Sequence, residues 1–132
     1  LQAAALRGVD VRILVPERAD SRLVNFAAYS YYEQILPAGV KIFRYQKGFL
    51  HQKVLLCDGK VAVGTGNLDN RSFRLNFEIT GFTDDARFAR EVAEMLEQDF
   101  AHALPEQLDD YLCKPWYFRA ACRAARLLSP VL

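Results

Sequence analysis

The chain has 132 residues, of which 52% are hydrophobic and 25% are charged. This composition is typical of one globular domain and excludes a disordered or fibrous protein. Seventeen basic and sixteen acidic residues leave a net charge of +1, so the overall charge favours neither nucleic acid nor an acidic substrate as partner. The three cysteines lack CxxC or Cys/His metal spacing, which argues against a disulfide framework or a zinc site and fits a reducing compartment.

Targeting signals are absent from the sequence. No apolar run approaches the roughly 20 residues that a bilayer-spanning helix needs, and no signal peptide is visible. The chain begins Leu-Gln-Ala rather than with methionine. We therefore expect a piece of a longer protein, for which an upstream anchor stays open.

Short β-branched runs alternate with helical patterns along the first third of the chain. Gly8 is typical of a helix end, and Pro16 and Pro37 are typical of interruptions. Asp20 or Ser21 can cap a helix whose apolar residues recur at helical spacing. The pattern predicts a helix over residues 1–7, a strand over 11–15, a helix up to about residue 36, and a strand over 40–44.

Two further strands flank Asp58-Gly59, a dipeptide typical of a two-residue hairpin turn. Asp84 can cap an amphipathic helix, and Pro105 ends that region. Strands that alternate with helices indicate an α/β domain in which helices cover the sheet. The remaining pattern predicts strands over residues 52–57, 60–65 and 77–82, a helix between Asp84 and Pro105, and a last helix over 116–128.

Two basic side chains share one face of the predicted hairpin. His51 and Lys53 are two residues apart, and such side chains leave the same face of a strand. The two-residue turn pairs Lys53 with Gly64. It also pairs His51 with Gly66, so that open space is expected beside both basic groups. Asn67 can bring its amide to this space. An imidazole, an ammonium and an amide suit a phosphate, because the imidazole can attack phosphorus or protonate a leaving oxygen while the others stabilise the non-bridging oxygens.

The spacing of these residues resembles a known signature. The stretch His51-Gln-Lys53-Val-Leu-Leu-Cys-Asp58, followed by Gly64-Thr65-Gly66 and Asn67, is similar to the HxKxxxxD…G[S/T]xN motif of the phospholipase D (PLD) superfamily. Residues 67–78 and 125–130 resemble the second, C-terminal motif of bacterial cardiolipin synthases and the stretch that ends them. The resemblance covers nearly the whole chain. Thr65-Gly66 is a mild departure, since many members carry Gly-Ser or Thr-Ala there.

The resemblance implies a PLD-like layered fold, with a mixed β-sheet flanked by helices on both faces. It also implies that two such motifs, from two halves of one chain or from a homodimer, build one phosphodiester site that needs no metal ion or other cofactor. One histidine carries the phosphoryl group covalently and the other acts as general acid and then base. The first-half histidine is usually the nucleophile. The resemblance therefore assigns the acid–base role to His51, with Lys53 and Asn67 on the phosphoryl oxygens.

The resemblance assigns supporting roles to other motif residues. Glu78 occupies the position of a carboxylate that generally bonds the far nitrogen of the histidine, and such a bond fixes the tautomer. Asp58 is expected to hold the turn rather than to touch phosphate. The hydroxyl of Thr65 is kept from the motif. Ser72 can support the phosphate pocket or cap a turn. The supporting set is Asp58, Gly64, Thr65, Gly66 and Ser72.

Other polar residues near the motif admit simpler explanations. Asp69, Arg71 and Arg74 can contact a head group or form a salt-bridged loop. Cys57 is expected to be a buried thiol rather than a reactive one. His102 lies near a helix end, where interaction with the helix dipole explains it.

The C-terminal tail has a one-sided charge. No acidic residue follows Asp110, while Arg119, Arg123 and Arg126 form a narrow stripe on a helical wheel. Such a helix suits the interface of an anionic bilayer, or it packs its apolar face on the domain, and both alternatives stay open. We accordingly predict a catalytic domain over residues 1–112 and an amphipathic helix over 113–132.

The resemblance implies the C-terminal half of a cardiolipin synthase at the cytoplasmic side of a bacterial membrane. Its partners would be phosphatidylglycerol, the anionic membrane surface and the N-terminal half of the same chain, without nucleic acid. The alternatives are a single-motif phosphodiesterase or nuclease that works as a homodimer, and an idle half that serves folding or membrane docking. The isolated chain is expected to be inactive.

Overall fold

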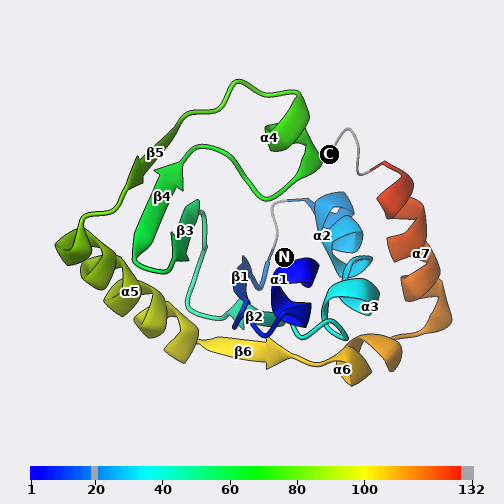
Figure 1. Cartoon of the computed structure of the whole chain (residues 1–132). Coiled ribbons are helices and arrows are strands. Elements are labelled where there is room, and N and C mark those ends of the chain that lie inside the picture. The colour runs from blue at the N-terminus through cyan, green and yellow to red at the C-terminus, as the bar shows by residue number, and fades with distance from the viewer. Residues whose placement is uncertain (19–20, 129–132) are drawn as a thin grey trace.

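The computed structural model describes residues 1–18 and 21–128. Figure 1 shows the elements in chain order. They are α1 (Gln2–Leu6), β1 (Arg12–Pro16), α2 (Arg22–Tyr29), α3 (Tyr32–Ile35), β2 (Lys41–Tyr45), β3 (Val54–Cys57), β4 (Lys60–Gly64), α4 (Asn70–Arg74), β5 (Thr80–Thr83), α5 (Ala86–Ala101), β6 (Ala103–Glu106), α6 (Leu108–Leu112) and α7 (Trp116–Leu127). Asp20, one of the two predicted helix caps, lies outside the described residues, as do the last positions of the 125–130 stretch.

The predicted helix that ends near residue 36 is wrong in one respect, because the structure divides it into α2 and α3. Ser30 lies at the division, where its hydroxyl donates to the carbonyl of Ala27 at 2.6 Å. A serine that bonds the preceding turn competes with the helical backbone and bends it. The capping residue of α5 is Asp85, one position after the predicted Asp84.

Three short elements were not predicted, namely α4, β6 and α6. The strand β6 contains Pro105, which pairs with Phe43 of β2. Proline cannot donate to a strand ladder, so it is confined to the edges of sheets. Because β6 is an edge strand, the proline is tolerated there, and Pro105 does not end the regular structure as predicted.

The strands form two three-stranded sheets. In the first, here called the mixed sheet, β1 pairs parallel with β2, and β2 pairs antiparallel with β6. In the second, here called the hairpin sheet, β3, β4 and β5 are all antiparallel. The predicted α/β class is confirmed, and helices flank both sheets.

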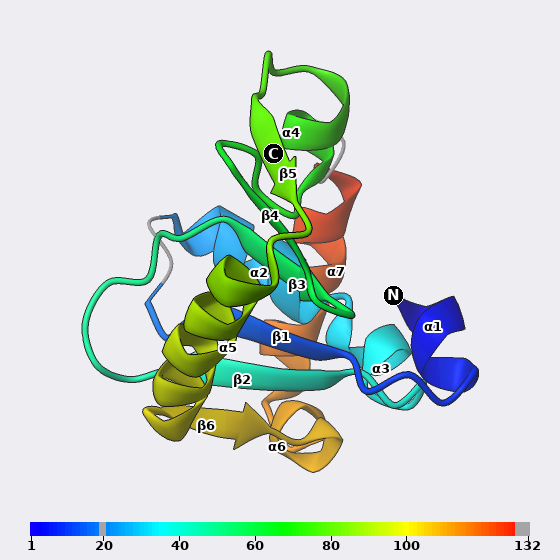
Figure 2. The ribbon, with the colours of Figure 1, turned by 60° about the vertical axis from the view of Figure 1, so that its left-hand side comes forward.

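Helices cover both faces of the mixed sheet (Figure 2). On one face Ile42 packs with Tyr29, Tyr32, Tyr111 and Cys122 in a core to which α2, α3, α6 and α7 contribute. On the other face the ring of Phe43 meets Phe100 of α5 edge to face, with centroids 5.0 Å apart. The successive residues Ile42 and Phe43 of β2 thus pack on opposite faces of the sheet, because side chains alternate between the two faces along a strand.

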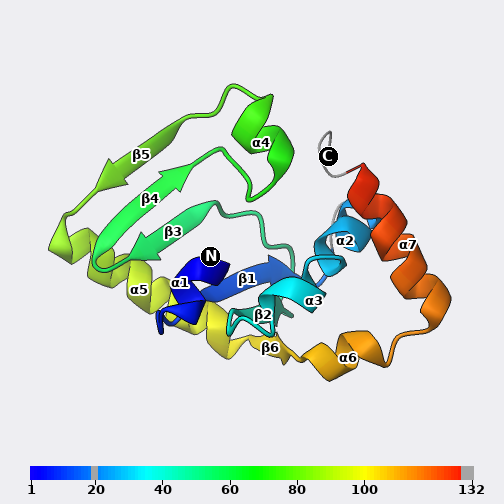
Figure 3. The ribbon, with the colours of Figure 1, turned by 45° about the vertical axis from the view of Figure 1, so that its right-hand side comes forward.

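The hairpin sheet has one covered face. Val61 packs there on Ala89 and Val92 of α5, and the same helix also contacts β2 and β6 of the mixed sheet. Figure 3 shows α5 running along both sheets. On the opposite face Leu55 and Phe82 are 58% and 80% exposed. The face of the hairpin sheet that turns away from α5 is therefore open.

The last helix packs on the domain. The ring of Phe118 meets Phe26 of α2 at 5.3 Å, and Cys122 is fully buried, which raises the pKa of its thiol to about 11. The predicted arginine stripe faces α3, where Arg123 pairs with Glu33 at 3.2 Å. Of the two alternatives for this helix, packing is the one that the structure shows. No helix in the described part of the chain is long and apolar enough to cross a membrane.

Candidate functional site

The hairpin that carries the motif turns at Asp58-Gly59, as predicted. Both residues have positive φ, 49° and 79°, which a two-residue turn of this twist requires. The amide of Gly64 donates to the carbonyl of Lys53 at 3.1 Å, so the predicted pairing of these residues is confirmed. The strand β3 begins only at Val54, because the regular ladder stops there. His51 and Lys53 thus precede the strand, and the predicted start at residue 52 is wrong.

His51 and Lys53 are in direct contact. The ammonium Nζ of Lys53 lies 3.0 Å from Nε2 of His51 and also 3.0 Å from its carbonyl oxygen. Because an ammonium can only donate, Nε2 accepts, and a neutral imidazole then carries its proton on Nδ1. The side chain of His51 is exposed and that of Lys53 is half-buried. The structure therefore brings together the two groups whose spacing predicted a phosphate site.

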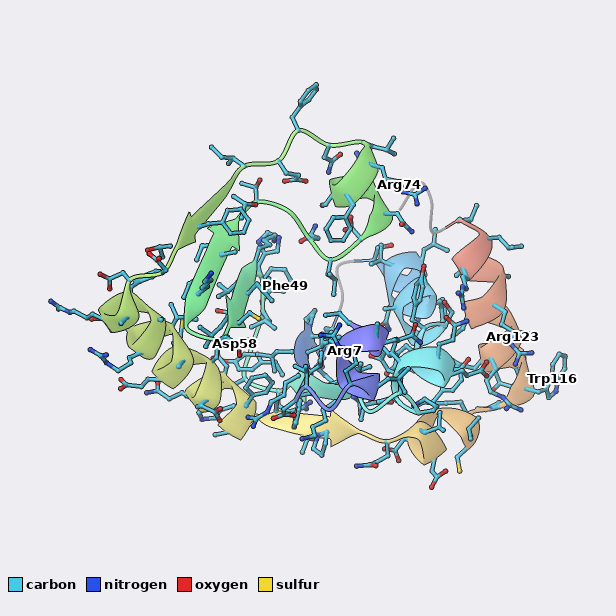
Figure 4. The ribbon with its side chains drawn as sticks, viewed as in Figure 1. Arg7, Phe49, Asp58, Arg74, Trp116 and Arg123 are labelled. Atoms are coloured by element: carbon cyan, nitrogen blue, oxygen red, sulfur yellow. The ribbon has the colours of Figure 1, made fainter. Side chains whose placement is uncertain are left out.

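An aromatic residue that was not predicted from the sequence also contacts His51. The ring of Phe49 stacks on the imidazole of His51, with centroids 5.5 Å apart and an interplanar angle of 17°. Figure 4 shows Phe49 beside β3, with Asp58 at the other end of the hairpin. The signal that could have found it is the alternation of an extended segment, which places Phe49, His51 and Lys53 on one face.

Glu78 lies on the segment that leads into β5. Its Oε2 accepts from the hydroxyl of Thr65 at 2.6 Å, and its Oε1 accepts from the amide of Asn76 at 3.1 Å. These bonds lower the pKa of Glu78 below its ordinary value, and the charge of Lys53 contributes in the same direction. The structure gives Glu78 and His51 other partners than the predicted bond between them. Asn76 is a second residue that the sequence reasoning missed.

The two motif glycines differ in what lies beside them. A Cβ on Gly64 would meet the carbonyl oxygen of Ile79 and the hydroxyl of Thr80, each at 2.5 Å. A Cβ on Gly66 would make only ordinary contacts of 3.7–3.8 Å with Glu78. The predicted open space is wrong for Gly64, because β5 fills it. This glycine permits the close approach of two strands.

Ser72 and its neighbours hold the turn after β4. The amide of Asn67 donates to Oγ of Ser72 at 3.0 Å, and the amide of Ser72 donates to Asp69 at 2.7 Å, which caps α4. Ser72 is buried, and the side chain of Asn67 is exposed. Arg71 donates to Asn76 at 3.3 Å. Hydrogen bonds therefore hold this loop, where a salt-bridged loop was one of the alternatives.

Two further predictions concern isolated residues. His102 follows α5 directly, and its Nδ1 lies 2.7 Å from the carbonyl of Gln98, so its place at a helix end is confirmed. Cys57 is exposed at the hairpin turn, and the prediction of a buried thiol is wrong, because this face of the sheet has no cover. Within residues 1–18 and 21–128, no group of three His, Cys, Asp or Glu residues is placed to hold a metal ion.

A comparison with protein families decides the affiliation. The family described as "Cardiolipin synthase, PLD-like domain" matches residues 1–101. The chain belongs to this family. The match covers both sheets except for β6, and it contains all the motif residues.

Curated relatives and a solved structure agree with the family. The chain is 51% identical to cardiolipin synthase A of Pseudomonas putida strain F1 over 133 aligned positions, which cover all of this chain and 28% of the relative. It is 53% identical to cardiolipin synthase A of Pseudomonas aeruginosa LESB58, with 27% of that relative covered. The chain thus spans little more than a quarter of these relatives.

The fold is similar to that of Nuc from Salmonella typhimurium, a phospholipase D family member. The two structures superpose with a TM-score of 0.69 at 24% sequence identity, over 81% of this chain and 70% of Nuc. The PLD-like fold predicted from the motif is thereby confirmed.

Proposed function

We propose that the chain supplies one histidine–lysine motif of a cardiolipin synthase active site, which a second motif outside these 132 residues completes. The contact between Lys53 Nζ and His51 Nε2 at 3.0 Å carries this proposal. It joins a proton-transferring group to a phosphate-binding group on the hairpin that bears the family motif. The open face of the hairpin sheet leaves room for a partner that brings the second histidine.

The reaction would transfer a phosphatidyl group from one phosphatidylglycerol to another. The histidine of the second motif attacks phosphorus, forming a P–N bond, and the P–O bond to glycerol breaks. His51 gives its proton to the departing glycerol oxygen. It then takes the proton of the incoming primary hydroxyl, whose oxygen displaces the phosphohistidine and yields cardiolipin. Lys53 and Asn67 stabilise the charge on the non-bridging oxygens.

The contact between Lys53 and His51 implies that substrate binding precedes proton transfer. Nε2 of His51 is occupied as an acceptor while Lys53 donates to it. An arriving phosphate is a stronger acceptor for an ammonium than a neutral imidazole. Lys53 therefore turns to the phosphoryl group, which frees Nε2 to take up a proton from water and to pass it to the departing glycerol oxygen.

The proposal extends to the surroundings of the enzyme. Phosphatidylglycerol and an anionic membrane surface are the expected partners, together with the N-terminal half of the same protein, at the cytoplasmic face of the bacterial membrane and without nucleic acid. Residues 1–112 form the catalytic unit, and residues 113–132 form a C-terminal part that contains α7 (Trp116–Leu127). The packing of α7 on α2 supports a helix that stays docked on this unit.

The test is to replace His51 by alanine in the complete enzyme and to measure cardiolipin formed from phosphatidylglycerol vesicles. Loss of the acid–base group should lower turnover by at least about 100-fold. The matched control is His102→Ala, since that ring bonds only a helix carbonyl among its described contacts, and it should keep wild-type turnover. The isolated chain, with one motif, should form no cardiolipin. Near-normal product from the His51 variant would refute the assignment, and an active dimer of the isolated chain would favour a single-motif phosphodiesterase.

A further inference from the structure

The motif accounts for His51 and Lys53, but it does not account for Phe49. This phenylalanine is 62% exposed, so burial in a core does not explain its orientation. Its ring lies parallel to the imidazole at 5.5 Å, within the range of favourable offset stacking. Lys53 contacts Nε2, at the edge of the same imidazole ring. The imidazole thus lies between an aromatic ring and an ammonium.

These two contacts differ in how long they can last during the reaction. His51 is exposed, and its predicted carboxylate partner, Glu78, binds Thr65 and Asn76. The contact with Lys53 ends when the ammonium turns to the phosphoryl group. The stack on Phe49 does not involve a ring nitrogen, so it can persist throughout.

We propose that Phe49 is a positioning residue that holds the imidazole plane of His51 while Lys53 binds the phosphoryl group. This inference rests on the proposed function. A benzene face stacks on a neutral imidazole and also attracts an imidazolium through its quadrupole. Phe49 can therefore keep the ring in place in both protonation states that acid–base catalysis requires.

Hydrogen bonds and a glycine turn fix the course of the chain directly before Phe49. The amide of Gln46 donates to the carbonyl of His102 at 3.0 Å, and its side chain donates to Glu17 at 2.8 Å. Gly48 follows with a φ of 97°, a left-handed conformation that glycine adopts without strain. The chain thus leaves an anchored point and turns sharply directly before Phe49.

The stack can be tested in the 132-residue chain by proton NMR, because His51 and His102 are its only histidines. A benzene ring shifts the signals of protons above its face. Phe49→Leu should move the ring-proton signals of His51 and leave those of His102 in place, whereas Phe49→Tyr should retain the wild-type positions. Phe82→Leu, the same change at an exposed position of β5, is the matched control and should move neither.

Turnover in the complete enzyme tests the positioning role. Phe49→Leu should lower kcat about two- to five-fold, the size of an exposed ring–cation interaction, with little change in KM. Phe49→Tyr should restore kcat, and Phe88→Leu, the same change at a partly exposed position of α5, should not alter it. The inference is overturned if the leucine and tyrosine variants lose kcat equally, or if the leucine variant retains both kcat and the His51 signals. A wild-type enzyme that forms no cardiolipin would refute the proposed function, while the NMR result would still decide whether Phe49 holds His51.

Discussion

The two sheets of the chain differ in how their faces are covered. The mixed sheet lies between α5 on one face and the aromatic core of Tyr29, Tyr32 and Tyr111 on the other. The hairpin sheet packs one face on α5 through Val61 and leaves the other face to solvent. The motif residues lie on the strands of the second sheet and on the segments directly next to them. The candidate site therefore lies on the hairpin sheet, which is the less covered of the two. The mixed sheet and its helices are here called the scaffold.

One carboxylate in each part of the molecule shows the same contrast. In the mixed sheet, Arg44 Nε lies 2.6 Å from Glu106, whose side chain is 1% exposed. Burial raises the pKa of Glu106, and the charge of Arg44 opposes this effect. Beside the hairpin sheet, Glu78 is half-buried, and hydrogen bonds from Thr65 and Asn76 lower its pKa. The carboxylate of Glu106 is enclosed by the scaffold, whereas the neutral partners of Glu78 lie on the motif-bearing segments.

The largest effect is expected in the scaffold. Tyr111 is fully buried and its ring stacks on Tyr29 with centroids 6.4 Å apart. Tyr111→Ala should lower the free energy of unfolding by about 3–5 kcal/mol, since it leaves a large cavity. Val61→Ala, in the core under the hairpin sheet, should cost only about 2 kcal/mol because it removes less buried volume. Urea unfolding measures both values.

A second variant at the same position separates packing from hydrogen bonding. The hydroxyl of Tyr111 is buried and has no hydrogen-bond partner in the described part of the chain. Tyr111→Phe removes this unpaired group and keeps the ring, so stability should rise or stay within about 1 kcal/mol of wild type. If Val61→Ala destabilised the chain more than Tyr111→Ala, the division into scaffold and site would be wrong.

The next effect is expected in the hairpin sheet itself. Gly64→Ala places a methyl group 2.5 Å from the carbonyl oxygen of Ile79, so β5 must move away from β4, at a cost of about 1–3 kcal/mol. The bond from the Thr65 amide to Ile79, now 3.0 Å long, should break. Amide exchange of Thr65 and urea unfolding would report both changes.

The neighbouring motif glycine supplies the control. Gly66→Ala meets Glu78 only at ordinary contact distances and should change stability by less than about 0.5 kcal/mol. Equal losses of stability in the two variants would contradict the view that Gly64 alone is required for close strand approach.

Much of the fold could be predicted because strong local signals carry it. The hairpin at Asp58-Gly59 depends on two adjacent residues, and α5 depends on a long apolar period. The elements that were missed lack such signals. The strand β6 exists because its residues pair with β2, and α4 because Asp69 can cap it. The exposure of Cys57 was missed for a related reason, since residue spacing does not tell whether a face has a cover.

The candidate site shows the same limit at the level of single side chains. The spacing of His51 and Lys53 predicted a shared face, and the structure places them in contact. Residue spacing could not predict that Gly64 makes room for β5 rather than for phosphate, because that depends on its pairing with Thr80, at the start of β5. Nor could it predict the choice of partner by Glu78, which depends on where the chain brings Asn76.

The smallest effect concerns this carboxylate. Since hydrogen bonds from Thr65 and Asn76 hold the pKa of Glu78 below its ordinary value of 4.5, the ionised form is the one that the fold favours. Its contribution to the order of the loop is complete above that value and is lost as the pH falls through the lowered pKa. The side-chain amide signal of Asn76 should therefore stay constant on acidification and shift only below the ordinary carboxyl range.

Glu78→Gln is the matched control, because it keeps the shape of the side chain and does not titrate. In this variant the Asn76 signal should show no step in acid. A step of equal size in both proteins would mean that another group reports on the loop. If the step appeared only in the wild type, the hairpin sheet would hold its site through one titrating carboxylate. In the scaffold, burial raises the pKa of Glu106, so this carboxyl takes up its proton at a higher pH than Glu78 does.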